Sequence, residues 1–438
     1  MRCASLALAL LFAGCGRDAE RAALAREALP QEVLVGALRA SPLPPPPADP
    51  TNAYAEDPRA AALGRSLFYD ARFSSNGEIS CASCHDPDLD WGDGAVTATG
   101  IASFGVHTPS LWNVAYNRWF FWDGRADTLW AQAVQPWEHP DEMGGDRVSF
   151  VRLLLDDSEL SARYEELFGA LPDVSGWPSS ARPVDEGSSD PMHSAWLGMS
   201  AQSKVEATRV IVNLAKSVAA FQRQMVTSET AFDRYIRGLR HGAAEDLAAF
   251  GEEELKGMEL FFGDARCHLC HHGPLFTDLE FHDVRLPYGV NESGEEVREM
   301  GRWDGIGAVL EDPLNSDGDF SDAPALLSGE APSVSGSARG HLEFLLRSPH
   351  TKGEFKTPGL RNAARTAPFT HRGVYANLEE VVRHYSELAD APAKRHADAE
   401  EILVPVHLDD GEVSALVAFL EALSSPRPGE ELRAPGAR

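Results

Sequence analysis

The sequence predicts a mainly α-helical protein with two similar domains, and three observations support this prediction. The motif Cys-x-x-Cys-His occurs twice, at Cys81–His85 and at Cys267–His271. Each copy follows the pattern Gly-x-x-Leu-Phe-(Tyr/Phe) and then Ala-Arg, at 64–72 and at 257–266. Apolar residues recur at helical spacing across 408–423. Because matched spacing indicates duplication, we expect two related domains, each built around one motif.

The Cys-x-x-Cys-His pattern is typical of c-type heme attachment, in which two thioether bonds hold the porphyrin and the histidine binds iron. We therefore expect two covalently bound c-type hemes, with His85 and His271 as iron ligands. The attachment residues would be Cys81 and Cys84 for the first heme, and Cys267 and Cys270 for the second.

Two other kinds of site also use Cys-x-x-Cys pairs. A zinc ribbon places its pairs roughly 15–20 residues apart, whereas these pairs lie in different halves of the chain. A redox dithiol gives no reason for a histidine to follow both pairs. Heme attachment is therefore the favoured interpretation, and it predicts a mainly α fold of two cytochrome c-like heme domains related by duplication.

The segment 408–423 predicts a terminal helix that closes the second domain. Asp409 and Asp410 are candidate N-cap residues, because a short acidic side chain accepts hydrogen bonds from the first turn. The expected buried stripe follows positions i, i+3, i+4 and i+7. It consists of Val413, Leu416, Val417 and Leu420.

Composition limits the function further. The chain has 438 residues, of which 43% are apolar, and this is enough for two or three globular domains. Its formal net charge of −28 argues against nucleic-acid binding, because no basic stripe offsets it. The charge favours a partner with a basic docking face, whose association should slow as salt rises. Six cysteines are too few for a disulfide scaffold of this size.

The first residues predict an export signal. Arg2 precedes a short apolar run, Ala4–Gly14, that is well below the ~20 residues needed to span a bilayer. We expect a signal peptide at 1–14. The segment Leu11–Cys15 resembles a bacterial lipobox, with Phe12 as a departure, and this places a lipid on Cys15. A periplasmic, membrane-anchored lipoprotein is expected, with the lipid as the only membrane contact; plain secretion into the periplasm is the alternative.

The composition of the remaining chain predicts its domain limits. Residues 15–55 are predicted to form a tether, because they contain the Pro-rich spacer Ser41–Pro47. Residues 176–200 read as a loop or linker, since they are rich in Ser, Pro and Gly. The expected order is signal peptide 1–14, tether 15–55, N-terminal heme domain 56–175, linker 176–200, C-terminal heme domain 201–425 and tail 426–438.

Several blocks make the sequence resemble the bacterial di-heme cytochrome c peroxidase and MauG family, from about Asp57 to Ser424. The resemblance implies that the N-terminal heme reacts with hydrogen peroxide and that the C-terminal heme passes or stores electrons. The donor would be a small cytochrome, a copper protein or a protein substrate being modified. Beside the two motifs, the blocks are Leu63–Asp70, Thr108–Asn113, Phe121–Ala126, His139–Met143 and Phe355–Asn362.

The resemblance also implies site residues. Trp122, Asp123 and Arg125 would organise the first heme pocket. The sixth ligand of the second heme is Met in the peroxidases and Tyr in MauG. The last methionine here is Met300, and Tyr385 matches the ligand position, with neighbouring His384 as a rival ligand. Phenolate favours ferric and higher iron states, so Tyr385 favours the MauG-like branch.

Two further expectations follow from the family pattern. The distal Gln and Glu that flank the Trp-Asp-Gly-Arg block align with Phe120 and Trp130, which cannot move protons. Gln132, Asp127 and His107 are nearby in the sequence and could substitute for them. The alternative function is therefore a di-heme electron-transfer cytochrome without peroxidase turnover. The family's calcium ion would be held partly by backbone oxygens of Thr366 and Pro368. Five tryptophans within 112–137 indicate either core packing or a path for oxidising equivalents.

Overall fold

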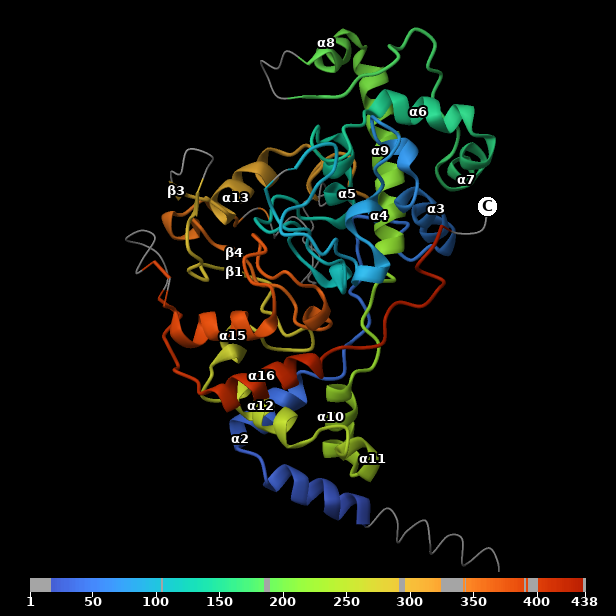
Figure 1. Cartoon of the computed structure of the whole chain (residues 1–438). Coiled ribbons are helices and arrows are strands. Elements are labelled where there is room, and N and C mark those ends of the chain that lie inside the picture. Colours follow the sequence, from blue (N-terminus) through green and yellow to red (C-terminus); the bar gives the residue numbers. More distant parts are fainter. Residues whose placement is uncertain are drawn as a thin grey trace, which may run out of the picture.

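The protein is mainly α-helical, as the sequence predicts (Figure 1). The computed structural model describes residues 17–103, 105–184, 190–290, 296–323, 342, 344–389, 391–392 and 401–435. The expected signal peptide and Cys15 lie outside these residues. No helix in the described part of the chain is long and apolar enough to cross a membrane.

The first hydrophobic core gathers around the long helix α9 (Ala201–Gln222). Helix α3 (Pro58–Phe68) packs along α9, and α5 (Leu129–Glu138) and α6 (Arg147–Asp156) pack against it as well. Helix α7 (Ser158–Phe168) covers α3 and α6. Because α9 supplies Val210, Leu214 and Phe221 among others to this core, it belongs with the N-terminal motif.

The second core is built from α12 (Glu252–Phe262), α16 (Asp410–Glu421) and α10 (Ala231–His241). Helix α15 (Leu378–Glu387) packs on α16, and α2 (Gln31–Arg39) packs on α12. The predicted terminal helix is confirmed: the Asp409 carboxylate accepts the Glu412 N–H at 2.9 Å.

The remaining elements are short. Strand β1 (Phe281–His282) pairs antiparallel with β4 (Phe355–Lys356), and β2 (Gly289–Val290) pairs with β3 (Glu296–Val297). Further α-helices in the described part of the chain are the short α4 (Cys81–Cys84), α8 (Pro191–Gly198) and α11 (Ala244–Leu247), and the longer α13 (Arg302–Glu311). The 3₁₀ turns are η1 (Ala71–Phe73), η2 (Pro87–Leu89), η3 (Val114–Tyr116), η4 (Cys267–Leu269), η6 (Pro349–Thr351) and η7 (Ala363–Arg365).

The expected tether, linker and tail each contain residues that pack against one of the two domains or lead directly into it. Helix α2 lies within the expected tether, but it buries Val33 and Ala37 in the second core. Apolar residues at i and i+4 form one face of a helix, and this face packs against the core. The expected linker contains α8 and is followed by α9, which belongs to the first core. The expected tail returns to the first domain, where Leu432 O accepts the Tyr69 hydroxyl at 2.6 Å (Figure 1).

Both domains use the same close helix contact. Gly64 on α3 faces the α9 backbone at Ser217, and a Cβ there would collide with the Ser217 carbonyl. Gly257 on α12 faces the α16 backbone at Ala415 in the same way. The glycine in each matched stretch therefore lets the helix before the motif lie directly against a partner helix, which explains why the pattern carries Gly at this position in both copies.

Replacing Gly257 with Ala should destabilise the protein. The added methyl group has no space against the Ala415 backbone, so the two helices must separate, at a cost of about 1–3 kcal/mol. Denaturant unfolding followed by circular dichroism measures this loss. The matched control is Gly198→Ala on α8, where a Cβ meets nothing within 4 Å and stability should stay level or rise slightly. Equal stabilities for the two variants would contradict the packing argument.

Candidate active site

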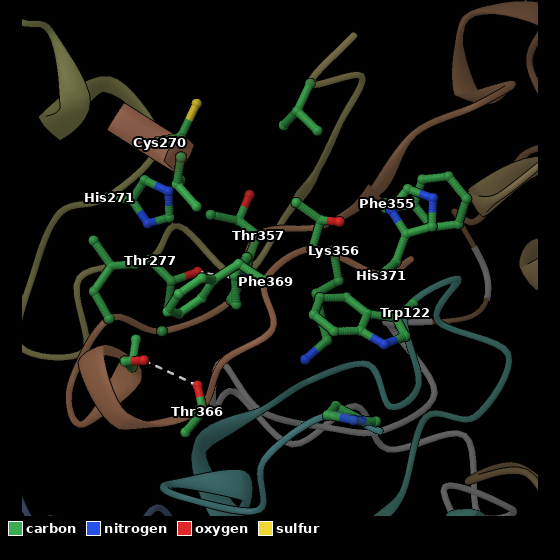
Figure 2. Close-up of a pocket in the computed structure, with 18 of the residues that line it drawn as sticks. Trp122, Cys270, His271, Thr277, Phe355, Lys356, Thr357, Thr366, Phe369 and His371 are labelled. Atoms are coloured by element: carbon green, nitrogen blue, oxygen red, sulfur yellow. Dashed lines mark hydrogen bonds between the residues drawn. The ribbon is translucent and has the colours of Figure 1, made fainter. Parts of the chain in front are cut away.

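One continuous cavity joins the two Cys-x-x-Cys-His motifs. Its wall includes Cys84 and His85 from the first motif, and Cys267, Cys270 and His271 from the second. Figure 2 shows the part near His271, where residues from both domains face the same space. The cavity therefore brings together two sequence motifs that lie in different halves of the chain.

The first motif begins at α4, which Ser80 caps through a reciprocal pair of bonds with Ser83. The Nδ1 atom of His85 lies 3.0 Å from the carbonyl oxygen of Trp91. Because a carbonyl only accepts, Nδ1 carries the proton, and the lone pair of Nε2 is the one left to bind a metal. Desolvation lowers the pKa of His85, so the ring is neutral as ligation requires.

The second motif repeats this arrangement. The Nδ1 atom of His271 lies 2.9 Å from the carbonyl oxygen of Phe276. Both carbonyls belong to non-glycine residues with left-handed backbone, Trp91 at φ 65° and Phe276 at φ 54°. Such residues are uncommon and mark a local constraint. The chain bends in the same way after each motif to present a carbonyl to the histidine.

The residues present fit covalently bound hemes. None of the four motif cysteines forms a disulfide, so all four are available for thioether bonds to porphyrin. Each motif leaves a histidine Nε2 as a ligand atom. The wall around the second motif is apolar, as a porphyrin face requires. It includes Leu275, Leu360, Val381, Val382, Leu416 and Leu420.

The Trp-Asp-Gly-Arg block lies on the first-domain side of the cavity. Trp122 Nε1 donates to the carbonyl of His107 at 2.8 Å. The Arg125 guanidinium lies 3.2 Å from the Asp123 carboxylate and 3.5 Å from the centre of the Phe121 ring. Trp122, Asp123 and Arg125 all line the cavity that joins the two motifs.

An amide and an acid line the cavity, although neither stands at the aligned positions Phe120 and Trp130. Gln132 and Glu142 both line the cavity, whereas Trp130 is fully buried in the core and donates to Thr51 Oγ1 at 3.0 Å. Phe120 lines the cavity and packs in the first core. Desolvation raises the pKa of Glu142, and nearby His139 and Arg125 oppose this increase.

The sequence contained a signal for Gln132. On α5 the core side chains are Trp130, Val134 and Trp137, which recur at i, i+4 and i+7. Gln132 and Pro136 are also four residues apart, and both line the cavity. They therefore lie on the face of α5 opposite to the core-facing tryptophans. Helical phase alone therefore separates the buried Trp130 from the cavity-facing Gln132.

Helix α15 separates the two candidate ligands of the second heme. Its cavity-facing side chains, Leu378, Val381, Val382 and Tyr385, follow the i, i+3, i+4, i+7 pattern. Desolvation raises the pKa of Tyr385, and the nearby Cys270 and Cys267 add to this. His384 is buried and its Nε2 lies 2.8 Å from the carbonyl of Val284. Tyr385 therefore faces the cavity, and His384 is engaged elsewhere.

Thr366 and Pro368, whose backbone oxygens would hold the expected calcium ion, line the cavity. The Oγ1 atom of Thr366 donates to the Ala363 carbonyl at 3.0 Å, and this bond does not involve the backbone oxygen of Thr366. Among the described residues, one cluster of three metal-ligating side chains occurs, formed by Cys270, Asp278 and His282. Its cysteine belongs to the second heme motif.

Comparisons with known proteins agree with this geometry. The family profile described as di-haem cytochrome c peroxidase matches residues 58–241. MauG of Methylorubrum extorquens is 31% identical over 385 residues, which cover 87% of this chain and 82% of that protein. The cytochrome-c peroxidase IdrP1 of Pseudomonas sp. strain SCT is 28% identical over 89% of this chain and 86% of that protein.

The chain belongs to the di-haem cytochrome c peroxidase and MauG family. The crystal structure of the diheme peroxidase BthA from Burkholderia thailandensis shares the fold, with a TM-score of 0.60, 22% identity and coverage of 89% of this chain and 92% of that chain. Membership makes this protein a di-heme oxidoreductase of the peroxidase type. It also implies two c-type hemes, hydrogen peroxide as oxidant and a donor or substrate partner.

The double variant Cys267→Ala/Cys270→Ala should carry one covalent heme instead of two. Without the second pair of thiols, no thioether bond forms at His271, while the first motif is unchanged. Mass spectrometry of the denatured protein measures the number of attached porphyrins. The control is His268→Ala inside the same motif, whose Nδ1 bonds to the Phe261 carbonyl, and which should keep both hemes. Two attached porphyrins in the double variant would exclude this assignment.

Proposed function

We propose that the protein is an exported di-heme oxidoreductase that uses hydrogen peroxide at the N-terminal heme. A donor protein supplies electrons through the C-terminal heme and aromatic residues. The observation that carries the proposal is that Gln132 and Glu142 line the cavity beside the first motif. When bound, the hemes supply the iron that accepts oxidising equivalents from peroxide. His85 would hold the first, and His271 with Tyr385 the second.

Glu142 is suited to move the proton that peroxide chemistry requires. Cleaving an O–O bond needs a group that takes a proton from one oxygen and returns it to the other. The Glu142 carboxyl lines the cavity and has a raised pKa, as is common for catalytic acids and bases. Gln132 Oε1 is buried and has no hydrogen-bond partner within the described structure, so it can orient an incoming hydroxyl.

Arg125 and Asp123 organise this pocket. The Arg125 Nε donates to Gln135 Oε1 at 3.1 Å, and its guanidinium contacts Asp123. Since Gln135 and Gln132 both lie on α5, these bonds fix the Trp-Asp-Gly-Arg loop to the helix that carries the amide.

Trp122 connects the two heme sites in this proposal. Its side chain donates to the His107 carbonyl, and its backbone oxygen accepts from Lys356 on β4 at 2.8 Å. Strand β4 continues into Thr357, whose carbonyl accepts from Thr277 in the loop after the second motif. An oxidisable ring at this junction offers a path for oxidising equivalents between the first pocket and the second heme.

In this proposal the second heme has the tyrosine ligand that is typical of MauG. Tyr385 faces the cavity at the position that matches the family's iron ligand, and phenolate stabilises oxidised iron.

We further propose a signal peptide at 1–14, a lipid on Cys15 and a periplasmic location. The donor or substrate protein would present a basic docking face to this acidic chain. A calcium ion between the hemes would use backbone oxygens of Thr366 and Pro368.

Replacing Glu142 with Gln should slow the reaction with peroxide by roughly 100- to 10,000-fold, because the amide cannot move the proton. Stopped-flow absorbance of the Soret band measures this rate. The control is Asp141→Asn, since Asp141 is the exposed neighbour. In the unmodified protein the rate should fall as the pH is lowered through the pKa of Glu142, which lies above the ordinary carboxyl value, and Glu142→Gln should remove this dependence.

Peroxide that leaves the spectra of the oxidised and half-reduced protein unchanged would instead support the electron-transfer alternative. A Glu142→Gln variant as fast as Asp141→Asn would remove Glu142 from the reaction.

Replacing Tyr385 with Phe should change the absorption and EPR spectra of the second heme, because the phenolate is lost as an axial ligand. Spectra of the oxidised protein at matched heme content measure the change. The control is His384→Gln, which leaves Tyr385 in place and should keep the spectrum of the second heme. The reverse pattern, with a change in His384→Gln alone, would assign the ligand to His384.

A further inference from the structure

Lys356 is a cavity-facing lysine that none of the proposed steps uses. It lies on β4, where its backbone pairs with Phe281 of β1 and its N–H donates to the Trp122 carbonyl. Its side chain lines the cavity that joins the two motifs. Figure 2 shows this side chain running beside Trp122. The ammonium group is thus placed at the junction of the two heme sites.

This ammonium group has no counter-charge from the described residues. No hydrogen bond or ion pair joins it to them, and desolvation alone lowers the pKa of Lys356 to about 8. Two other cations on the cavity wall, Arg125 and Arg361, are each paired with a carboxylate. Arg125 contacts Asp123 at 3.2 Å, and Arg361 contacts Asp233 at 2.8 Å. An unpaired ammonium out of water is unfavourable, so a counter-charge is expected.

The cofactors bring the missing charge. Each c-type heme carries two propionate carboxylates, and the two motifs place two hemes in this one cavity. No carboxylate of the described residues acts on the Lys356 ammonium, since desolvation is the only influence on its pKa. A propionate is therefore the anion available to Lys356, and a lysine–carboxylate pair is strong where water is excluded.

We propose that the Lys356 ammonium binds a propionate carboxylate of one of the two hemes and thereby raises the reduction potential of that heme. Lys356 is a positioning residue in this proposal, because it acts through the propionate. The physical reason is electrostatic: ferric heme carries one more positive charge than ferrous heme, so a nearby fixed cation favours the ferrous form.

The backbone around Lys356 ties this charge to both sites. Its N–H is held by Trp122 of the first pocket, and the next residue, Thr357, accepts from Thr277 Oγ1 at 2.8 Å. Leu360 further along donates to the Leu275 carbonyl in the loop after the second motif. A shift of either heme loop would therefore move the ammonium relative to the propionates.

The test measures the reduction potentials of both hemes in Lys356→Met and Lys356→Arg by spectroelectrochemical titration without peroxide. Lys356→Met should favour the ferric form of at least one heme by about tenfold, which is a fall of about 59 mV for a one-electron couple. Lys356→Arg keeps the charge and should restore most of the potential. The control is Lys256→Met, a half-exposed lysine on α12, which should leave both potentials unchanged.

Resonance Raman spectra provide a second readout, since the propionate bending bands should shift in Lys356→Met and not in Lys256→Met. Unchanged potentials and bands in Lys356→Met, with both hemes attached, would overturn the proposal. Equal shifts in Lys356→Met and Lys356→Arg would also overturn it, because the charge would then not be the cause. The proposal rests on heme binding alone, so a failure of the peroxide reaction would not affect this result.

Discussion

The hydrogen bond between each motif histidine and a backbone carbonyl is the interaction on which the site depends. Trp91 O holds Nδ1 of His85, and Phe276 O holds Nδ1 of His271. Without these bonds the rings could rotate or exchange tautomers, and Nε2 would not be fixed toward the cavity. The left-handed backbone at Trp91 and Phe276 is the local cost of presenting these carbonyls. The surrounding cores hold that backbone in place.

The two halves share this device but differ in the side chains that line the cavity near each motif. Polar groups that can carry or orient a proton, Glu142 and Gln132, line the cavity near the first motif. Near the second motif, α15 presents Tyr385 among apolar side chains. One half is thus suited to proton-coupled chemistry and the other to holding oxidised iron. This difference arises from α5 and α15 and not from the motifs, which are alike.

Local features of the site could be predicted from the sequence, and non-local ones could not. The motifs, the helix capped by Asp409 and the matched glycines involve neighbouring residues, so their patterns are visible in the chain. The position of α2 in the second core depends on contacts with α12, which no local pattern encodes. Gln132 is intermediate. The family pattern aligns Trp130 with the distal position and leaves Gln132 as one of three candidate substitutes, and only the helical phase of α5 separates Gln132 from Trp130.

One buried ion pair links the first histidine to the second domain. Asp90 is fully buried, precedes Trp91, and accepts from Arg365 Nη2 at 2.7 Å and from Trp112 Nε1 at 3.1 Å. Arg365 lies in η7 and also donates to the Ser425 carbonyl beyond α16. Because breaking a buried pair leaves an uncompensated charge, the two domains are held in one relative position. The carbonyl that orients His85 is therefore set partly by the second domain, which couples the geometry of the two heme sites.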